Sequence, residues 1–243
     1  MRLHRFYVSQ PLGEEVVIDD VSLVNQWTKV FRYEAGDLVV LFNGDGYDYF
    51  YSLTSTSKNS CSLTRTKQSP SHAYIPKRRS FLFVASIKKD LFELVAEKAT
   101  ECGVTDIVPI ISDRTEKKNL DTRRLEMIIK EATEQCGRGS LATLHESQTL
   151  IEALESLSML GISEKNTYIT TLFGTPVREM LVNQANNVAE NEPIAFFVGP
   201  EGGWSDKEEE VYRNSRYTSI SFGKTVLRAE TAGIACAILS SLI

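Results

Sequence analysis

Five short apolar runs between residues 80 and 222 constrain the fold of this chain more than any other feature. They read SFLFVAS (80–86), DIVPII (106–111), TYITTLF (167–173), PIAFFV (193–198) and YTSISF (217–222). Continuous apolar runs of this length are typical of strands that are covered on both faces. Patterns with helical spacing alternate with them and lie at 90–102, 121–136, 148–160, 175–188 and 230–243. SDKE (205–208) is a capping box, which predicts the start of a further helix. The alternation predicts an α/β sheet with helices on both faces.

The first 68 residues show a different pattern, with short strands punctuated by turn residues. DLVVLFNGDGYDYFYSLTST alternates about Gly44-Asp45-Gly46, which is a hairpin signal. Short strands of this kind predict a small β-barrel, and SLVNQWTKVF (22–31) predicts one short helix. Residues 68–79 carry two prolines and are typical of a linker. We therefore predict a barrel domain over residues 1–72 and an α/β domain over residues 73–243.

Composition makes several kinds of protein improbable. The chain has no run of roughly 18 apolar residues, and its N-terminal MRLHRFYVSQ lacks the apolar core of a signal peptide, so we expect a cytoplasmic protein with no membrane partner. The four cysteines have no CxxC spacing and the three histidines no ligand spacing, so we expect no metal site. Residues 145–243 hold 13 acidic and 7 basic side chains, whereas residues 1–144 are near neutral with basic clusters that can bind phosphate.

Three of the predicted strands end in glycine-bearing backbone that leads into a helix. These ends are TTLFGTP (170–176), VGPEGGWS (198–205) and ISFGKTVLRAETA (220–232). Ligands of open α/β sheets bind at the carboxyl ends of the strands, and glycine lets main-chain groups approach a flat heteroaromatic base closely. Neither GxGxxG nor GxxxxGK[ST] is present, which disfavours dinucleotide and P-loop sites. Each turn taken alone is equally consistent with a tight connection.

Six stretches carry a resemblance to a known family. They are HRFYV (4–8), VFRYEAGDLVVLFNGDG (30–46), EKATECGV (97–104), EATEQCGR (131–138), FVGPEGGWSDKE (197–208) and VLRAETAG (226–233). In this order and spacing they resemble the SPOUT-class methyltransferases that act on N3 of a uridine in small-subunit ribosomal RNA, the RsmE family. The chain departs from the family at Gln26, where histidine is frequent, and at Phe31, Cys102 and Ala142. The cofactor motifs are intact.

The resemblance implies a small PUA- or OB-like RNA-binding barrel followed by a SPOUT α/β domain with a deep C-terminal trefoil knot. It also implies S-adenosylmethionine (SAM) as cofactor, 16S ribosomal RNA or the small ribosomal subunit as partner, and a homodimer that uses the knot helices. On this basis the expected SAM-binding residues are Leu172, Gly174, Val198, Gly199, Pro200, Glu201, Gly202, Gly203, Phe222, Gly223, Val226, Leu227, Glu230, Thr231 and Ala232.

Methylation of a uracil N3 places a specific demand on the site. The N3–H group is a poor nucleophile at neutral pH, so a guanidinium beside the developing oxyanion would help. We predict catalytic roles for Arg228, Arg138 and Glu201, although Arg228 could instead pair with Glu230 or Glu201, and Glu201 could simply fix its loop. No general base is evident. The residues expected to bind RNA are Arg5, Lys29, Arg32, Arg114 and Arg138.

Two other functions fit the same residues. One is a SPOUT methyltransferase that acts on a ribose 2′-hydroxyl or on a different base. The other is a catalytically silent RNA-binding protein, which the intact glycine turns disfavour.

Overall fold

The chain folds into two compact units. The structure, a computed structural model, describes residues 3–115, 119–184 and 192–243. One unit comprises Met1–Ile75 together with Thr133–Leu141, and the other comprises Pro76–Ala132 and Ala142–Ile243. The domain boundary expected at residues 72 and 73 stays a prediction. Within the described residues, no helix is long and apolar enough to cross a membrane, and no group of three potential metal ligands occurs.

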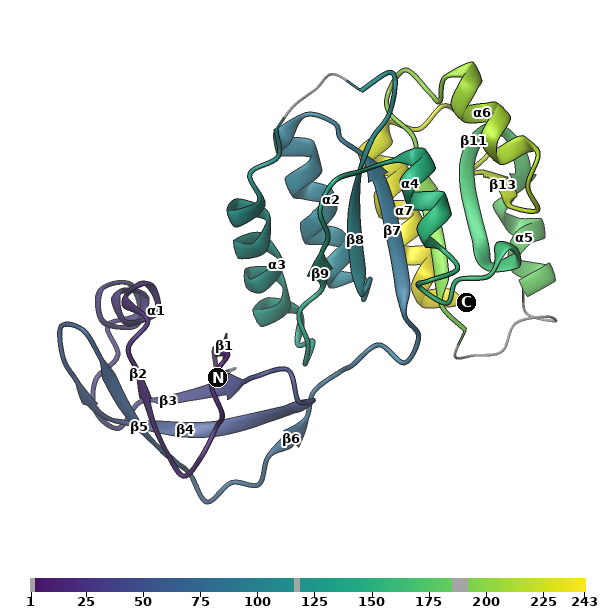
Figure 1. Cartoon of the computed structure of the whole chain (residues 1–243). Coiled ribbons are helices and arrows are strands. Elements are labelled where there is room, and N and C mark those ends of the chain that lie inside the picture. The colour runs from purple at the N-terminus through teal and green to yellow at the C-terminus, as the bar shows by residue number, and fades with distance from the viewer. Residues whose placement is uncertain (1–2, 116–118, 185–191) are drawn as a thin grey trace. The chain divides into compact units, whose positions relative to one another are not determined.

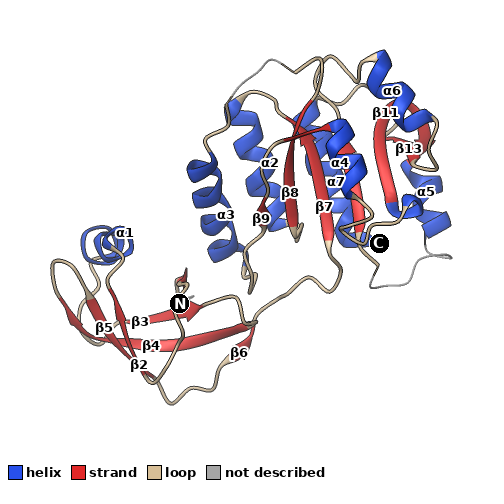
Figure 2. Ribbon diagram, viewed as in Figure 1, coloured by secondary structure: helices blue, strands red, loops and turns tan. Residues whose placement is uncertain are grey.

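The first unit is built mostly of strands, as Figure 2 shows. Its sheet has the order β1 (Arg5–Tyr7), β3 (Leu38–Phe42), β4 (Tyr47–Thr56), β5 (Cys61–Arg65), β2 (Glu15–Ile18), and β6 (Ser71–His72) pairs with β4. The predicted hairpin is confirmed, because β3 and β4 pair antiparallel about the Gly44–Gly46 turn. Part of the expected linker forms β6. Closure of this sheet into a barrel stays a prediction.

The expected helix at 22–31 forms in two parts. α1 (Val21–Asn25) begins at Asp20, whose carboxylate accepts hydrogen bonds from the backbone N–H groups of Ser22 and Leu23. The helix continues as a π-helix over Gln26–Phe31. The two helical segments bury Leu23, Val24 and Trp27 in the core of the first unit, because removing these apolar side chains from water is favourable.

The second unit is a parallel α/β sheet, as the apolar runs predicted. Its strands lie in the order β10 (Gln148–Thr149), β8 (Asp106–Ile111), β7 (Ser80–Ala85), β12 (Ile194–Val198), β11 (Thr167–Pro176), β13 (Thr218–Ser221), and β9 (Thr143–Leu144) pairs with β8. All of these pairs are parallel. Every residue of β7 and β12 is buried, because helices cover both faces of the sheet.

Helices cover the sheet of the second unit from both sides (Figure 1). They are α2 (Lys89–Glu101), α3 (Thr122–Cys136), α4 (Leu150–Ser156), α5 (Val177–Gln184), α6 (Asp206–Arg213) and α7 (Ala229–Leu242), and a 3-10 turn spans Glu164–Asn166. The buried faces of α4 and α6 pack with Phe83 and Phe197, whose rings stack at 4.2 Å. On the opposite face, α7 lies against α2 and β7. The core therefore lies in two layers around the central strands.

A buried carboxylate ties together the amino ends of two central strands. Asp106 begins β8, is only 2% exposed and accepts two hydrogen bonds from Arg79, at 2.7 and 2.9 Å. His145 Nε2 lies 2.7 Å from one of its oxygens, and Thr105 donates to the other. Burial alone would raise the pKa of Asp106, but these hydrogen bonds outweigh it and lower the pKa to about 2.

Candidate cofactor pocket

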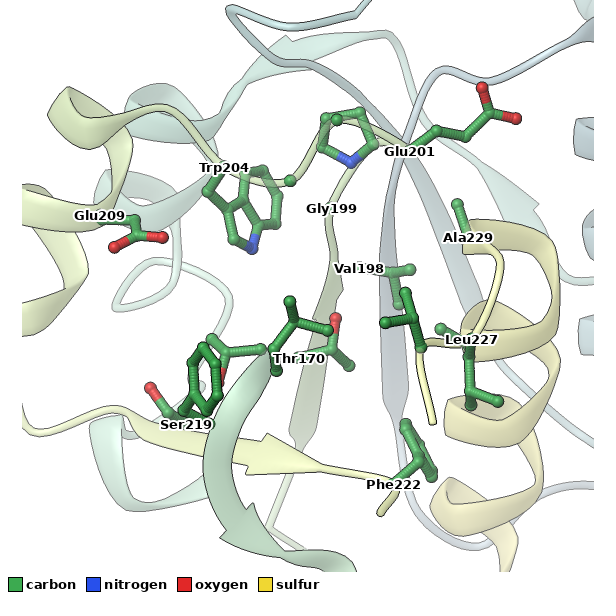
Figure 3. Close-up of a pocket in the computed structure, with 18 of the residues that line it drawn as sticks. Thr170, Val198, Gly199, Glu201, Trp204, Glu209, Ser219, Phe222, Leu227 and Ala229 are labelled. Atoms are coloured by element: carbon green, nitrogen blue, oxygen red, sulfur yellow. The ribbon is translucent and has the colours of Figure 1, made fainter. Parts of the chain in front are cut away.

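A pocket of about 500 Å³ lies where β11, β12 and β13 end. This is the edge of the sheet at which α/β proteins bind ligands. Figure 3 shows that the lining comes from the ends of these strands, the turn after β12, the loop after β13 and the start of α7. The lining residues are Arg114, Thr170, Thr171, Leu172, Phe173, Val198, Gly199, Pro200, Glu201, Gly202, Gly203, Trp204, Glu209, Tyr212, Arg213, Ser219, Phe222, Gly223, Thr225, Val226, Leu227, Ala229 and Ala232.

The turn at 199–203 packs against a buried tryptophan. Trp204 is 4% exposed and belongs to the core of the second unit. A Cβ at Gly199 would lie 3.0 Å from its ring, which is closer than nearly all real contacts, so a larger residue would displace the indole. The glycine at 199 thus lets the turn lie directly on the core, and the rest of the turn borders the pocket.

The wall contributed by β11 depends on an irregularity in that strand. Its pairing with β13 shifts register between Thr170 and Thr175, and four residues of this stretch, Thr170 to Phe173, line the pocket. Gly174 ends the stretch, and a Cβ there would lie 2.6 Å from the backbone of Ser219 and Ile220. This glycine therefore allows two strands to approach each other and does not line the pocket.

Charged and polar groups surround the pocket mouth. Glu209 pairs with Arg213 one helical turn later, whereas the exposed Glu201 directs its carboxylate away from the other labelled side chains (Figure 3). Arg114 donates from Nη1 to the carbonyl oxygen of Gly202 at 3.0 Å. Burial is the main reason that the pKa of Tyr212 is raised to about 12.

The pocket gathers most of the residues that the sequence predicted for SAM. Twelve of them line it, namely Leu172, Val198, Gly199, Pro200, Glu201, Gly202, Gly203, Phe222, Gly223, Val226, Leu227 and Ala232. Gly174, Glu230 and Thr231 are not among its lining residues. Glu230 is 7% exposed in the first turn of α7, beside the pocket residue Ala229. SAM binding by each of these residues stays a prediction.

The predicted catalytic arginines lie in different surroundings. The side chain of Arg228 is 83% exposed, and its Nη1 lies 4.0 Å from the carboxylate of Glu230. The ion pair that the sequence offered as an alternative role is therefore present only as a long contact. Arg138 is 2% exposed within the first unit, where its backbone pairs with Tyr74. Neither lines the pocket. Their catalytic roles stay predictions.

The predicted RNA-binding residues divide into buried and exposed groups. Arg5 forms a bidentate pair with Asp48 and also donates to the carbonyl oxygens of Thr133, Glu134 and Arg138, so it closes the end of α3 inside the first unit. Lys29 and Arg32 are exposed, and Arg32 has φ of 55° at the end of the π-helix. Arg114 is half-exposed at the pocket mouth.

Comparison with known proteins identifies the family. A sequence family described as an RNA methyltransferase domain matches residues 75–241, and one described as an RNA methyltransferase PUA domain matches residues 28–64. The chain belongs to this RNA methyltransferase family. Ribosomal RNA small subunit methyltransferase E of Rickettsia conorii is 30% identical over 241 residues, which cover 96% of this methyltransferase and 93% of the relative. The expected membership is confirmed.

Solved structures agree over almost the whole length. A methyltransferase of Legionella pneumophila, in complex with the bound cofactor SAM, is 26% identical with a TM-score of 0.84 and covers 100% of this chain and 97% of its own. Ribosomal RNA small subunit methyltransferase E of Neisseria gonorrhoeae, bound to S-adenosylmethionine, is 24% identical with a TM-score of 0.80 and shares the fold. The match covers 98% of this chain and 96% of the neighbour. A PUA-like N-terminal part followed by an α/β methyltransferase fold is thereby established for this methyltransferase.

Several lining residues escaped the sequence analysis. Trp204 directly follows the glycine turn, so its position could have been inferred from the motif. Tyr212 and Glu209 lie on the helix opened by the predicted capping box, where helical spacing could have suggested them. Thr171 and Phe173 lie in TTLFGTP, one of the strand ends singled out in the sequence, but no sequence signal indicates the register shift of β11 at this point. The other lining residues that were not predicted are Arg213, Thr170, Ser219, Thr225 and Ala229.

Proposed function

We propose that this methyltransferase transfers a methyl group from SAM to N3 of a uridine in 16S ribosomal RNA, with the cofactor held in the pocket of the second unit. The observation that carries the proposal is the pocket itself, because it gathers 12 predicted cofactor residues from three separate strand ends. The full-length similarity to small-subunit methyltransferase E and to structures with bound SAM supports it.

The residues present fit the chemistry of SAM. Val198, Leu227 and Ala229 form an apolar wall that suits the adenine ring, and the turn at 199–203 offers backbone groups for its polar edge. Glu209 lines the pocket and can accept hydrogen bonds from hydroxyl or ammonium groups, whereas Glu201 would have to turn its carboxylate toward the pocket to do so (Figure 3). Arg114 and Arg213 at the mouth are cations for a carboxylate or a phosphate.

SAM, when bound, supplies a methyl group on a sulfonium, so the transfer needs no metal. The new bond forms between the methyl carbon and N3 while the carbon–sulfur bond breaks and the N3 proton passes to solvent or to a base. The chain has to hold the uracil in line and to stabilise the negative charge that develops on its carbonyl oxygens. We assign that charge stabilisation to Arg228, whose exposed side chain directly follows the loop at 222–227 that lines the pocket.

The finer features belong to the same proposal. We infer a SPOUT-type trefoil knot near the C-terminus, a barrel-shaped PUA-like RNA-binding domain and a homodimer. Support for the dimer comes from α7, an almost entirely apolar helix on which Ile238 is 46% and Leu242 66% exposed. Support for RNA binding by the first unit comes from the matched PUA family and from the exposed Lys29 and Arg32.

Mass mapping of 16S ribosomal RNA from a strain that lacks the gene tests the proposal. We expect one uridine to lose a methyl group from its base and to regain it when the wild-type gene is restored. Loss of a ribose methyl group would favour the 2′-hydroxyl methyltransferase instead. An unchanged methylation map would favour the catalytically silent RNA-binding protein.

A further inference from the structure

A buried carboxylate outside the pocket fixes the turn that borders it. Glu208 lies in the first turn of α6, is 6% exposed and does not line the pocket. Its Oε2 accepts hydrogen bonds from the backbone N–H of Ser205 at 2.7 Å and from the hydroxyl of Ser112 at 3.0 Å. Its Oε1 accepts from the backbone N–H of Asp113 at 3.1 Å. One carboxylate thus joins two segments that are far apart in the sequence.

The segment after β8 holds the same turn from its own side. The hydroxyl of Ser205 donates to Asp113 Oδ2 at 2.6 Å, and Arg114 donates to the carbonyl oxygen of Gly202 at 3.0 Å. Residues 112–114 and 202–208 are therefore linked by side-chain hydrogen bonds in both directions. We refer to Ser112, Asp113, Arg114, Ser205 and Glu208 as the clamp.

The capping role of Glu208 explains only part of this arrangement. A capping box requires the bond from Ser205 N–H to the N3 carboxylate and the reverse bond to the hydroxyl of Ser205, and both are present. The bonds to Ser112 and Asp113 satisfy no donor of α6. They connect the helix to the carboxyl end of β8, and so the turn at 199–203 is held at both its ends, by β12 and by the clamp.

We propose that Glu208 is a positioning residue for the cofactor, acting through the clamp to keep the turn at 199–203 in the shape that binds SAM. A turn that samples other shapes binds its ligand more weakly in proportion to the time spent in the competent one. Loosening the clamp should therefore weaken SAM binding and leave the rate at saturating SAM nearly unchanged. This inference rests on the proposed function, because it assumes that SAM is the ligand of the pocket.

Glu208→Gln tests the clamp with a minimal change of shape. A carboxamide has one acceptor oxygen, so its NH₂ group must face either the N–H of Asp113 or the N–H of Ser205, and one of these two part-buried donors loses its partner. The matched control is Glu210→Gln, which makes the same charge change at an exposed position of the same helix. Calorimetry with SAM, steady-state methylation of small-subunit RNA, and hydrogen exchange of residues 112–115 and 199–205 are measured for the full-length protein.

For Glu208→Gln we expect the dissociation constant and the KM for SAM to rise about tenfold, kcat to stay within about threefold of wild type, and exchange to quicken in both segments. Glu210→Gln should match wild type throughout. Equal SAM affinity in the two variants would overturn the inference, as would a kcat loss with unchanged KM. If Glu208→Gln fails to fold, the clamp is tested with Ser112→Ala, which removes one of its hydrogen bonds. We expect the KM for SAM to rise about threefold in this variant, and an unchanged KM would equally overturn the inference. If wild-type protein binds no SAM, the proposed function itself fails.

Discussion

Gly174→Ala is the substitution for which the structure gives the clearest energetic expectation. The new Cβ would lie 2.6 Å from backbone atoms of Ser219 and Ile220, so β11 and β13 must separate until that distance exceeds 3.0 Å. Because the atoms in the way are backbone atoms of β13, no side chain can rotate to make room. Overpacking of this kind costs about 1–3 kcal/mol. For a chain of this size each kcal/mol lowers Tm by roughly 2–4 °C, so we expect a fall of roughly 2–12 °C.

Scanning calorimetry of the purified protein measures this effect, with Gly202→Ala as the control. A Cβ at Gly202 meets only the Arg114 side chain, at the ordinary contact distance of 3.5 Å, and its backbone has no positive φ. Gly202→Ala should therefore leave Tm within a degree of wild type. Gly174→Ala should also weaken SAM binding, because the displaced segment carries Thr170 to Phe173 into the pocket wall. Equal Tm values for the two variants would refute the steric argument.

Three further predictions follow from named charges. Because the pKa of Asp106 is lowered from 3.8 to about 2 on folding, this carboxylate stabilises the fold fully above pH 3.8, and the stabilisation is lost as the pH falls toward 2. Asp106→Asn should therefore remove about 2 kcal/mol from the part of the unfolding free energy that depends on pH in this acid range. An identical pH profile of stability in the two proteins would contradict this. Replacing Lys29 and Arg32 by alanine should reduce the log–log salt slope of RNA binding by roughly 0.7–0.9 for each lost phosphate contact, whereas an unchanged slope would make them plain surface charge. Arg228→Ala should lower the single-turnover methyl-transfer rate on the order of a hundredfold with little loss of SAM affinity. Arg228→Lys should not restore the full rate, because lysine lacks the planar guanidinium. A wild-type rate in the alanine variant would mean that Arg228 has a structural role.

The sequence predicted the fold of the second unit well because its signals are local. Continuous apolar runs located β7, β8 and β12 to within a residue or two, and the capping box at Ser205 and Glu208 is present as expected. β11 was predicted to end at residue 173, but the structure extends it to Pro176 across a register shift with β13. That shift depends on contact with a strand more than 40 residues away in sequence, which no local pattern encodes.

The site was predicted in part for a similar reason. The turns that line the site could be predicted because glycine indicates a close approach between the backbone and another group. The sequence does not show whether that group is a ligand or another part of the protein. Gly199 lines the pocket as predicted and also makes room for the ring of Trp204. Gly174 was grouped with the cofactor residues as well, but it makes room for the backbone of β13 and is not among the lining residues. Likewise Arg5 was expected to bind RNA, and its burial among the carbonyl groups at the end of α3 became visible only once Thr133–Leu141 was placed in the first unit.

Methyl transfer in a purified system tests the central claim most directly. Small-subunit RNA and intact small subunits are incubated with the protein and with SAM carrying a labelled methyl group, and the RNA is then digested to nucleosides. A parallel reaction uses Gly199→Val, whose side chain would press on Trp204 at the base of the turn. The account predicts label in 3-methyluridine with the wild-type protein and almost none with the folded variant. Label in a 2′-O-methylated nucleoside, no label at all, or equal labelling by the two proteins would contradict it.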